Sequence, residues 1–236
     1  MAYNISYQLG APPAAFSQLA ALKNLRASGF IPRTIYDIGA FQGQWSREAG
    51  RVFKAAEIIQ FEANSDNAPN LRQNGRRFFI VALAAQDAAQ RAFFVSKRII
   101  ATGASLYRER TRFYAEEEFA TRMVKTTRLD TLVAEQKLNY PDLMKLDVQG
   151  AELEVLAGAQ NAIARCSALI LETSLLNYNK DAPLIADVMK AINDLGLKCV
   201  DICEVHRLGP GLLLQVDLLF VRQDIHKEYC RLAGLT

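Results

Sequence analysis

The sequence lacks several features that mark membrane, secreted or nucleic-acid-binding proteins. Its 236 residues contain no apolar run of the roughly 18 residues that a membrane-spanning helix needs. The polar first ten residues contain no basic segment followed by an apolar stretch, so no signal peptide is predicted. The formal net charge of +3 is too small to indicate nucleic acid as the main partner. We therefore expect a cytoplasmic protein that has neither a membrane nor a nucleic acid as its partner.

The sequence also has few cysteines, and they form no disulfide or metal-binding pattern. Cys166, Cys199, Cys203 and Cys230 are scattered through apolar surroundings. Cys199 and Cys203 lie within one predicted strand, but no second pair of cysteines or histidines accompanies them. Because structural zinc sites need four such ligands, we expect reduced thiols in the core and no metal site.

Half of the residues are hydrophobic and 22% are charged, which is the balance of a soluble protein with a full core. After Pro32, strand-like and helix-like segments alternate, a pattern typical of a parallel sheet with helices on both faces. Strands are predicted at 34–40, 57–62, 78–83, 143–148, 168–172, 198–205 and 213–221. Helices are predicted at 14–28, 45–53, 151–164 and 183–195. The short connection at 208–211 requires the last two strands to form an antiparallel hairpin.

The predicted fold class is a single α/β domain with a mostly parallel, Rossmann-like, seven-stranded sheet, an antiparallel C-terminal hairpin and helices on both faces. Residues 1–33 are predicted to form an N-terminal helical segment and residues 34–236 the main domain. Two further strands are expected at 92–96 and 123–128, and the stretch between them is rich in arginine and glutamate. We interpret residues 98–122 as a lid or insertion.

A glycine-containing loop follows the first predicted strand, where doubly wound sheets bind their ligands. It contains Asp37, Gly39, Gln42 and Gly43 before the next helix begins. The glycines allow a sharp turn and close approach of the backbone. Loop amides and the helix N-terminus can hold a carboxylate, and Asp37 can hold an ammonium group. A cofactor with both groups is a methionine derivative. The glycine spacing differs from that of dinucleotide-binding loops, which disfavours NAD.

A second cofactor contact is predicted at Glu62, the last residue of the strand at 57–62. A carboxylate in this position can accept hydrogen bonds from both hydroxyls of a ribose, and charged hydrogen bonds of this kind contribute roughly 1.5 to 3 kcal/mol each. The glycine loop and Glu62 together therefore predict a nucleoside cofactor with an amino-acid end.

From residue 34 to about residue 177 the sequence resembles the FkbM family of methyltransferases. The most specific block is 144–159, Met-Lys-Leu-Asp-Val-Gln-Gly-Ala-Glu-Leu-Glu-Val-Leu-Ala-Gly-Ala. The glycine loop and the segments 61–63, 82–83, 102–106 and 128–132 also match. The family pattern normally has Glu where this sequence has Gln149 and Asn where it has Phe41. The first departure argues against a direct acid–base or metal role at position 149, and the second leaves both glycines in place.

The resemblance implies a class I methyltransferase fold, S-adenosylmethionine as the cofactor and a small-molecule acceptor. It implies O-methylation of a hydroxyl on a sugar, a polyketide or another small metabolite. It also places Ala63, Ala82 and Leu83 in the cofactor site, and Ser105 beside the substrate. A Rossmann-like nucleotide-binding protein without transferase activity and an NAD-dependent oxidoreductase remain as alternatives.

An alcohol acceptor needs a positioned base as the new bond forms, and Asp147, at the end of the strand at 143–148, is the first candidate. Its alternative role is to cap the following helix. Glu152 is the second catalytic candidate, although a helix dipole would stabilise a carboxylate there in any case. Glu172, at the end of the next strand, is predicted to contact the substrate. His206 is interpreted as a solvated residue at a strand end.

Arg108 is a further candidate for substrate binding, because it lies among arginines and aromatic residues at 107–114. Arginine binds carboxylates and phosphates, and aromatic rings stack on other rings. The alternative is a solvated helix face with Arg–Glu pairs.

Overall fold

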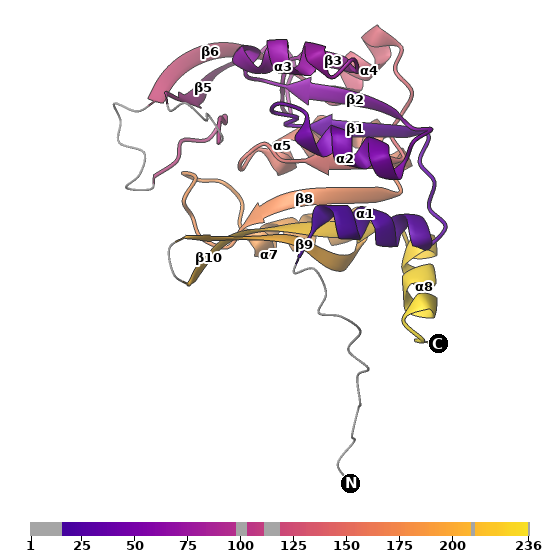
Figure 1. Ribbon diagram of the computed structural model, residues 1–236. Coiled ribbons are helices and arrows are strands. Elements are labelled where there is room, and N and C mark those ends of the chain that lie inside the picture. The colour runs from indigo at the N-terminus through magenta and orange to yellow at the C-terminus, as the bar shows by residue number, and fades with distance from the viewer. Residues whose placement is uncertain (1–15, 98–102, 111–118, 209–210, 236) are drawn as a thin grey trace.

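The computed structural model describes residues 16–97, 103–110, 119–208 and 211–235. Its main feature is a seven-stranded sheet in the order β3-β2-β1-β7-β8-β10-β9 (Figure 1). The strands are β1 (Thr34–Ile38), β2 (Glu57–Glu62), β3 (Arg77–Ile80), β7 (Leu143–Leu146), β8 (Ala168–Ser174), β9 (Lys198–Leu208) and β10 (Leu212–Val221). β3, β2, β1, β7 and β8 pair in parallel, and β10 pairs antiparallel with both β8 and β9. The predicted α/β class and C-terminal hairpin are confirmed.

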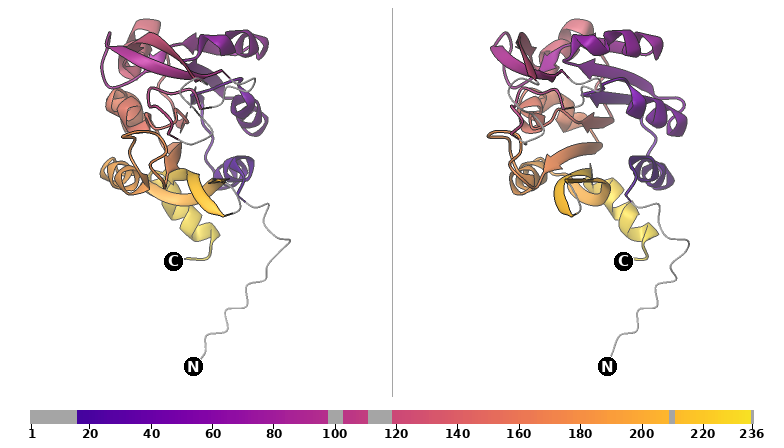
Figure 2. Two further views of the ribbon diagram at one scale, coloured as in Figure 1. Left: turned by 90° about the vertical axis from the view of Figure 1, so that its left-hand side faces the viewer. Right: turned by 60° about the vertical axis from the view of Figure 1, so that its left-hand side comes forward.

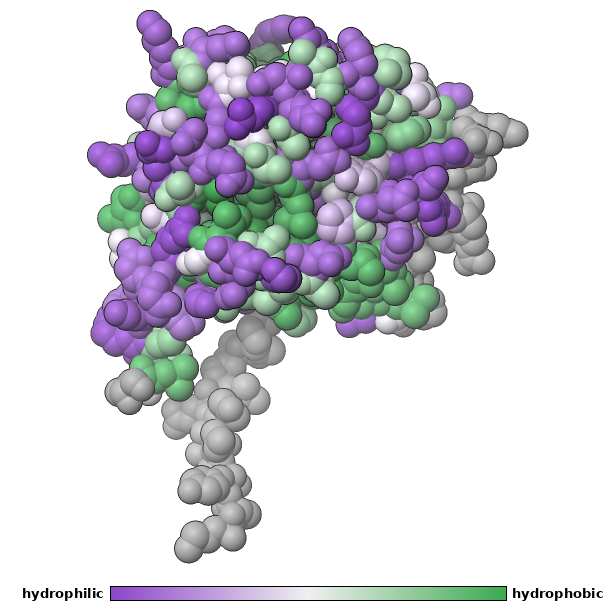
Figure 3. All heavy atoms as spheres, turned by 180° about the vertical axis from the view of Figure 1, so that it is seen from behind, coloured by the Kyte–Doolittle hydropathy of each residue, from purple (hydrophilic) through white to green (hydrophobic). Residues whose placement is uncertain are grey.

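Two layers of helices cover this sheet, one on each face (Figure 2). One face carries α1 (Gln18–Ala27), α2 (Gln44–Val52) and α8 (Gln223–Leu232). The other carries α4 (Leu129–Gln136), α5 (Glu152–Ala157), α6 (Gln160–Arg165) and α7 (Ile185–Asp194). The 3-10 turn η1 (Ser65–Asn67) and α3 (Ala68–Gln73) connect β2 to β3. Seen from behind in Figure 3, the surface is largely hydrophilic, with hydrophobic side chains between the polar regions.

The central strands β1 and β7 are mostly apolar because both of their faces are buried, with Asp37 and Lys145 as their charged residues. All five residues of β1 are buried, and successive side chains point to opposite faces of the sheet. Ile35 packs in the core beneath α1 and α2, whereas Tyr36 packs in the core beneath α4 to α7. None of the helices in the described ranges has the length and apolar character needed to cross a membrane.

The predicted third strand at 78–83 proves to be two strands in two sheets. β3 ends at Ile80, and Ala82–Leu83 forms β4, which pairs with β6 (Phe119–Thr127). β6 also pairs with β5 (Gln90–Ser96), giving a small second sheet near the carboxyl ends of the parallel strands (Figure 1). The amide of Val81, between the two halves, donates to the carbonyl of Glu62 and keeps β4 beside β2.

The predicted helix at 151–164 is also divided, into α5 and α6, at Gly158. The carbonyl of Gly158 accepts a hydrogen bond from the amide of Asp130 in α4, and the carbonyl of Ala84 approaches the other side of the glycine. Because these backbone groups lie so close to Gly158, the helix is interrupted at this residue. The helices α3, α4 and α8 were not predicted, and α8 is held by Ile225 and Tyr229, four residues apart on one face.

The crowding at Gly158 predicts a loss of stability when a side chain is added there. A Cβ atom at this position would lie 2.2 Å from the Ala84 carbonyl oxygen, a backbone atom that cannot rotate away. Gly158→Ala should lower the free energy of unfolding by about 1 to 3 kcal/mol, the usual cost of overpacking. Gly211→Ala is the matched control, because a Cβ there meets nothing within 4 Å. Urea unfolding followed by circular dichroism measures the stability of both variants. Equal stabilities would show that the Ala84 carbonyl does not crowd position 158.

Candidate functional site

Two cavities meet at the carboxyl ends of β1 and β7. We call the first, of about 160 Å³, the apolar pocket, because most of its lining side chains are apolar, among them Phe61, Val81, Leu83, Phe93, Leu106 and Val148. We call the second, of about 510 Å³, the polar pocket; it is lined by Ser17, Gln18, Gln44, Trp45, Glu48, Lys145 and Glu204 among others. Gly39, Phe41 and Asp147 line both. The two cavities are therefore neighbours at one edge of the sheet.

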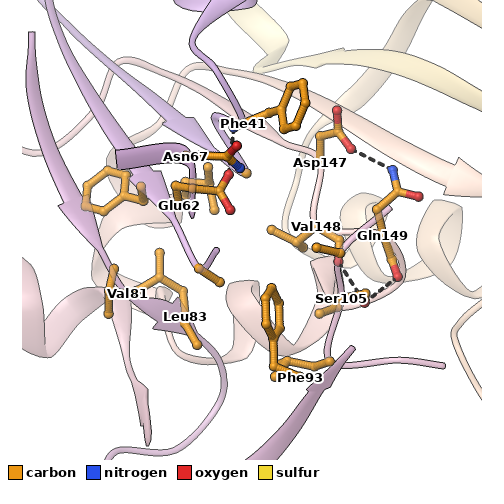
Figure 4. A pocket seen from close by; sticks show the side chains of 18 of the residues that line it. Phe41, Glu62, Asn67, Val81, Leu83, Phe93, Ser105, Asp147, Val148 and Gln149 are labelled. Carbon is orange, nitrogen blue, oxygen red and sulfur yellow. Dashed lines mark hydrogen bonds between the residues drawn. The ribbon is translucent and has the colours of Figure 1, made fainter. Parts of the chain in front are cut away.

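The apolar pocket brings together much of the predicted cofactor site (Figure 4). The predicted residues that line it are Gly39, Glu62, Ala63, Ala82, Leu83, Ser105 and Asp147. β4 supplies Ala82 and Leu83, and β5 supplies Phe93, so the small second sheet forms one wall of the cavity. The shape and chemistry suit a flat apolar ring with a polar group near Glu62.

Glu62 is 7% exposed, and its carboxylate accepts hydrogen bonds from two backbone amides. The amide of Phe41 donates to its Oε2 at 2.6 Å, and the amide of Asn64 donates to its Oε1 at 2.7 Å. Burial raises the pKa of Glu62, although these amide hydrogen bonds act in the opposite direction. The side chain of Asn67 also hydrogen-bonds to this carboxylate, so Glu62 fixes the glycine loop against the end of β2 and keeps one remaining acceptor position for a ligand hydroxyl.

The glycines of the loop are required by the protein's own packing. Gly39 and Gly43 both have a positive φ, which favours glycine. A Cβ at Gly39 would lie 1.8 Å from the backbone oxygen of Asp147, and one at Gly43 would lie 2.1 Å from Nδ2 of Asn74. Gly39 lines both cavities, whereas Gly43 and Gln42 do not appear in the walls of either one. Their contact with a cofactor stays a prediction.

Asp37 lies beneath the loop and not at a cavity wall. It is fully buried, and the hydroxyl of Ser46 in α2 donates to its Oδ2 at 2.6 Å. Burial raises the pKa of Asp37, and the nearby ammonium of Lys145 lowers it in part. The structure therefore shows Asp37 joining β1 to α2, and the predicted contact with a ligand ammonium stays a prediction.

Asp147 is held at the junction of the two cavities by two hydrogen-bond donors. Lys145 Nζ donates to its Oδ2 at 2.8 Å, and Gln149 Nε2 donates to its Oδ1 at 2.9 Å. Lys145 is almost completely buried, whereas the Asp147 side chain is 30% exposed. Burial would raise the pKa of Asp147, but the Lys145 ammonium outweighs it and lowers the pKa below its ordinary value. Asp147 is therefore an ionised carboxylate that faces the cavities.

Gln149 connects Asp147 to Glu172. Its Nε2 also donates to Oε1 of Glu172 at 2.7 Å, and the hydroxyl of Tyr178 donates to its Oε1 at 3.0 Å. Gln149 has a φ of 57°, a left-handed conformation held by Asn179, whose Nδ2 donates to the Gln149 carbonyl. The Gln149 amide therefore donates to two carboxylates, which an ionised glutamate cannot do because it only accepts hydrogen bonds.

No side-chain hydrogen bond caps α5, so the capping role considered for Asp147 is not seen, and Glu152 instead binds amides of the loop before this helix. Its carboxylate accepts hydrogen bonds from the amides of Val148 (2.9 Å to Oε1) and Gly150 (3.0 Å to Oε2). Glu152 is 5% exposed and lines neither cavity in the described residues. Burial raises its pKa to about 7. The structure thus shows Glu152 shaping the loop behind Asp147, and its catalytic role stays a prediction.

The predicted substrate residues lie in different surroundings. Ser105 lines the apolar pocket, and its hydroxyl donates to the carbonyl of Gln149 at 2.8 Å (Figure 4). Arg108 belongs to a segment that pairs with residues 178–180 and does not appear in the wall of either cavity. Of the predicted lid, residues 98–102 and 111–118 lie outside the described residues. Residues 103–106 form part of the apolar pocket wall, and the lid role stays a prediction.

Glu172 is 6% exposed and lies within β8, two residues before the strand ends. It pairs in register with Asp217 of β10, which is 3% exposed. Burial raises the pKa of Glu172, and the carboxylates of Asp147 and Asp217 raise it further. Sequence reasoning missed Lys145 and Asp217. The signal was present, because each is a charged residue between apolar neighbours in a buried strand.

Comparison with models of protein families matches residues 37–199 to the methyltransferase FkbM domain. The matched part is well over half of the 236 residues. A search of curated proteins found no match.

Comparison with solved structures finds methyltransferases of low sequence identity. Magnesium protoporphyrin IX methyltransferase from Synechocystis is 14% identical, with 86% of this chain and 77% of that chain covered and a TM-score of 0.48. Precorrin-6y C5,15-methyltransferase from Geobacter metallireducens is 14% identical, with coverages of 87% and 88% and a TM-score of 0.43. The N-methyltransferase NodS from Bradyrhizobium japonicum is 9% identical, with coverages of 86% and 93% and a TM-score of 0.47.

The raised pKa of Glu152 predicts a specific pH dependence of stability. Between its ordinary pKa of 4.5 and about 7, the folded protein holds a proton on Glu152 that the unfolded chain releases. This contribution to the free energy of unfolding is therefore present at low pH and is lost as pH rises through about 7, by at most about 1.4 kcal/mol per pH unit.

Glu152→Gln should make the decline of stability between pH 5 and pH 7 shallower, whatever its effect on the absolute stability. Urea unfolding at several pH values measures this slope. Glu135→Gln, on the exposed face of α4, is the control and should keep the wild-type slope. A wild-type slope in Glu152→Gln would show that Glu152 is ionised throughout this range.

Proposed function

The chain belongs to the FkbM methyltransferase family, and we propose that it transfers the methyl group of S-adenosylmethionine to a hydroxyl oxygen of a small metabolite such as a sugar or a polyketide. The observation that carries this proposal is the position of Asp147. Its ionised carboxylate faces the junction of an apolar and a polar pocket, where a cofactor and an acceptor would meet.

The residues of the apolar pocket fit the adenosyl part of this cofactor. Apolar side chains from β2, β4 and β5 offer surfaces for a flat ring, and Glu62 offers carboxylate oxygens for ribose hydroxyls. The loop at Gly39 would hold the methionine part, because it lines both cavities. When bound, S-adenosylmethionine supplies a methyl group on a positively charged sulfur, which is already activated for transfer.

The polar pocket would then hold the acceptor, with Asp147 orienting its hydroxyl. Alignment of the two reacting atoms is the main task of the protein in a direct displacement. The low pKa of Asp147 makes it a weak base toward a free alcohol. The hydroxyl proton becomes strongly acidic as the new C–O bond forms, so a carboxylate with a low pKa still accepts it late in the reaction.

The charges of the polar pocket favour oxygen over nitrogen as the target atom. Among the described residues that line this cavity, Glu48, Asp147 and Glu204 are acidic and Lys145 alone carries an ammonium. An amine acceptor enters water-filled sites as an ammonium ion, and neighbouring carboxylates stabilise this unreactive protonated form. A neutral alcohol has no such penalty and can donate its proton to a carboxylate.

The first test concerns the cofactor pocket. Glu62→Gln removes the negative charge and places an amide NH₂ group near backbone donors, so the affinity for S-adenosylhomocysteine should fall about 10- to 100-fold, the effect of losing one charged hydrogen bond. Glu57→Gln, at the exposed start of the same strand, should bind as the wild type does. Isothermal titration calorimetry measures both variants. Wild-type affinity of Glu62→Gln would mean that the ribose is bound elsewhere.

The second test concerns Asp147. Asp147→Asn keeps the shape but cannot accept the proton, so turnover should fall about 10²-fold or more while cofactor affinity changes little. The assay follows tritiated methyl transfer to a small-molecule extract, and mass spectrometry of the labelled product locates the methyl group. Asp194→Asn, which breaks an exposed ion pair with Lys190 in α7, is the control. Near wild-type turnover of Asp147→Asn, or a product methylated on carbon or nitrogen, would reject the proposed chemistry.

A further inference from the structure

We propose that Glu172, His206 and Asp217 bind a divalent transition-metal ion beside the polar pocket. The three residues come from the neighbouring strands β8, β9 and β10. Each offers one ligand atom, and these atoms all lie within 4.8 Å of one another. Ligands of one small metal ion lie about 3 to 4 Å apart at bond lengths near 2.1 Å, so modest side-chain rotations would complete the site.

The strand pairing brings these residues together. Asp217 is directly opposite Glu172 on one side, and two residues earlier Gln215 is directly opposite His206 on the other. Residues opposite each other in a sheet, and residues two apart in a strand, project from the same face. The three side chains therefore share one face of the rigid sheet, the kind of support that a metal site needs.

Two buried oxygen atoms, one in this cluster and one beside it, have no hydrogen-bond partner within the described part of the chain. One is Oδ1 of Asp217, a residue that is only 3% exposed, and the other is Oε1 of Gln18 at the start of α1. The two side chains are in contact, because Nε2 of Gln18 donates to Oδ2 of Asp217. Both unpartnered atoms are acceptors, and a buried acceptor without a partner is costly. A cation is the partner that would satisfy a carboxylate and an amide oxygen together.

The hydrogen-bond donors around Glu172 and Asp217 do not replace the cation that these carboxylates lack. The amides of Gln149 and Gln215 both donate to Oε1 of Glu172, so neither uses its Oε2. The ammonium of Lys145, which acts on both Glu172 and Asp217, pairs with Asp147 at 2.8 Å. Buried carboxylates are normally paired with a cation or coordinated to a metal. The cluster of Glu172 and Asp217 therefore has more negative charge than the side chains around it balance.

The donor set indicates which kind of metal would bind. One imidazole and two carboxylates suit Mn²⁺, Fe²⁺ or Zn²⁺ better than Mg²⁺ or Ca²⁺, which prefer oxygen ligands alone. Three protein ligands also leave coordination positions for water or for oxygen atoms of a bound molecule. If the proposed methyl transfer is correct, these positions would orient a hydroxyl of the acceptor near Asp147. The binding of the metal itself does not depend on that function.

Metal binding is tested directly with untagged protein that has been treated with a chelator and dialysed. Calorimetry with MnCl₂ should show about one equivalent of binding to the wild type, and the sharp electron paramagnetic resonance signal of free Mn²⁺ should decrease in parallel. His206→Ala should weaken binding at least 10-fold, since it removes one ligand. Asp217→Asn should weaken it as well. His226→Ala, the control in α8, should bind as the wild type does.

No binding of Mn²⁺ or Zn²⁺ by the folded wild type, or equal binding by His206→Ala, would overturn the metal site. The methyl-transfer assay then tests the orienting role. Activity that is lost with the chelator and restored by Mn²⁺ supports it. Activity that is unaffected by the chelator, in a protein that binds the metal by calorimetry, would overturn the orienting role and leave the proposed methyl transfer intact.

Discussion

The buried ion pair between Lys145 and Asp147 is the interaction on which the functional edge of the sheet depends. Burial alone would lower the pKa of Lys145, but the carboxylates of Asp147 and Asp37 raise it, so the ammonium remains charged inside the protein. Because Lys145 is buried, removal of the Asp147 side chain would leave the ammonium without its hydrogen-bonded carboxylate, which is destabilising. The pair also fixes the rotation of the Asp147 carboxylate, because its Oδ2 is bound to Lys145 and its Oδ1 to Gln149.

This constraint explains why glutamine is suitable at position 149, where the family pattern has glutamate. Gln149 lies between Asp147 and Glu172 and donates to both. A glutamate here would add a third carboxylate to a region that contains one ammonium, and it would need a proton or a further cation. The departure therefore does not weaken the site, because the amide connects Asp147 at the cavity junction to Glu172, a ligand of the proposed metal site.

The sequence predicted those features that depend on short segments. The alternation of apolar strands and helices gave the sheet and its hairpin, and the ends of β1, β2 and β7 gave Gly39, Glu62 and Asp147. The features that it missed depend on contacts between distant residues. The division of the strand at 78–83 requires a partner strand about 40 residues away, in β6. The sequence left open whether Asp147 caps α5, and only the geometry shows that no side chain caps this helix and that Glu152 binds the amides of the preceding loop.

The position of Asp147 follows from backbone pairing and needs no ligand. β1 and β7 are adjacent and parallel, with Ile38 opposite Leu146, so the residues after these positions are neighbours. The amide of Asp147 donates to the carbonyl of Ile38 at 3.0 Å, and the absence of a side chain at Gly39 lets the Asp147 carbonyl approach the loop. A larger residue at position 39 would separate the two strand ends, and with them the walls that the two cavities share. The point at which a cofactor and an acceptor can meet is therefore determined by the order of the strands, and Lys145 and Gln149 determine which charge is present there.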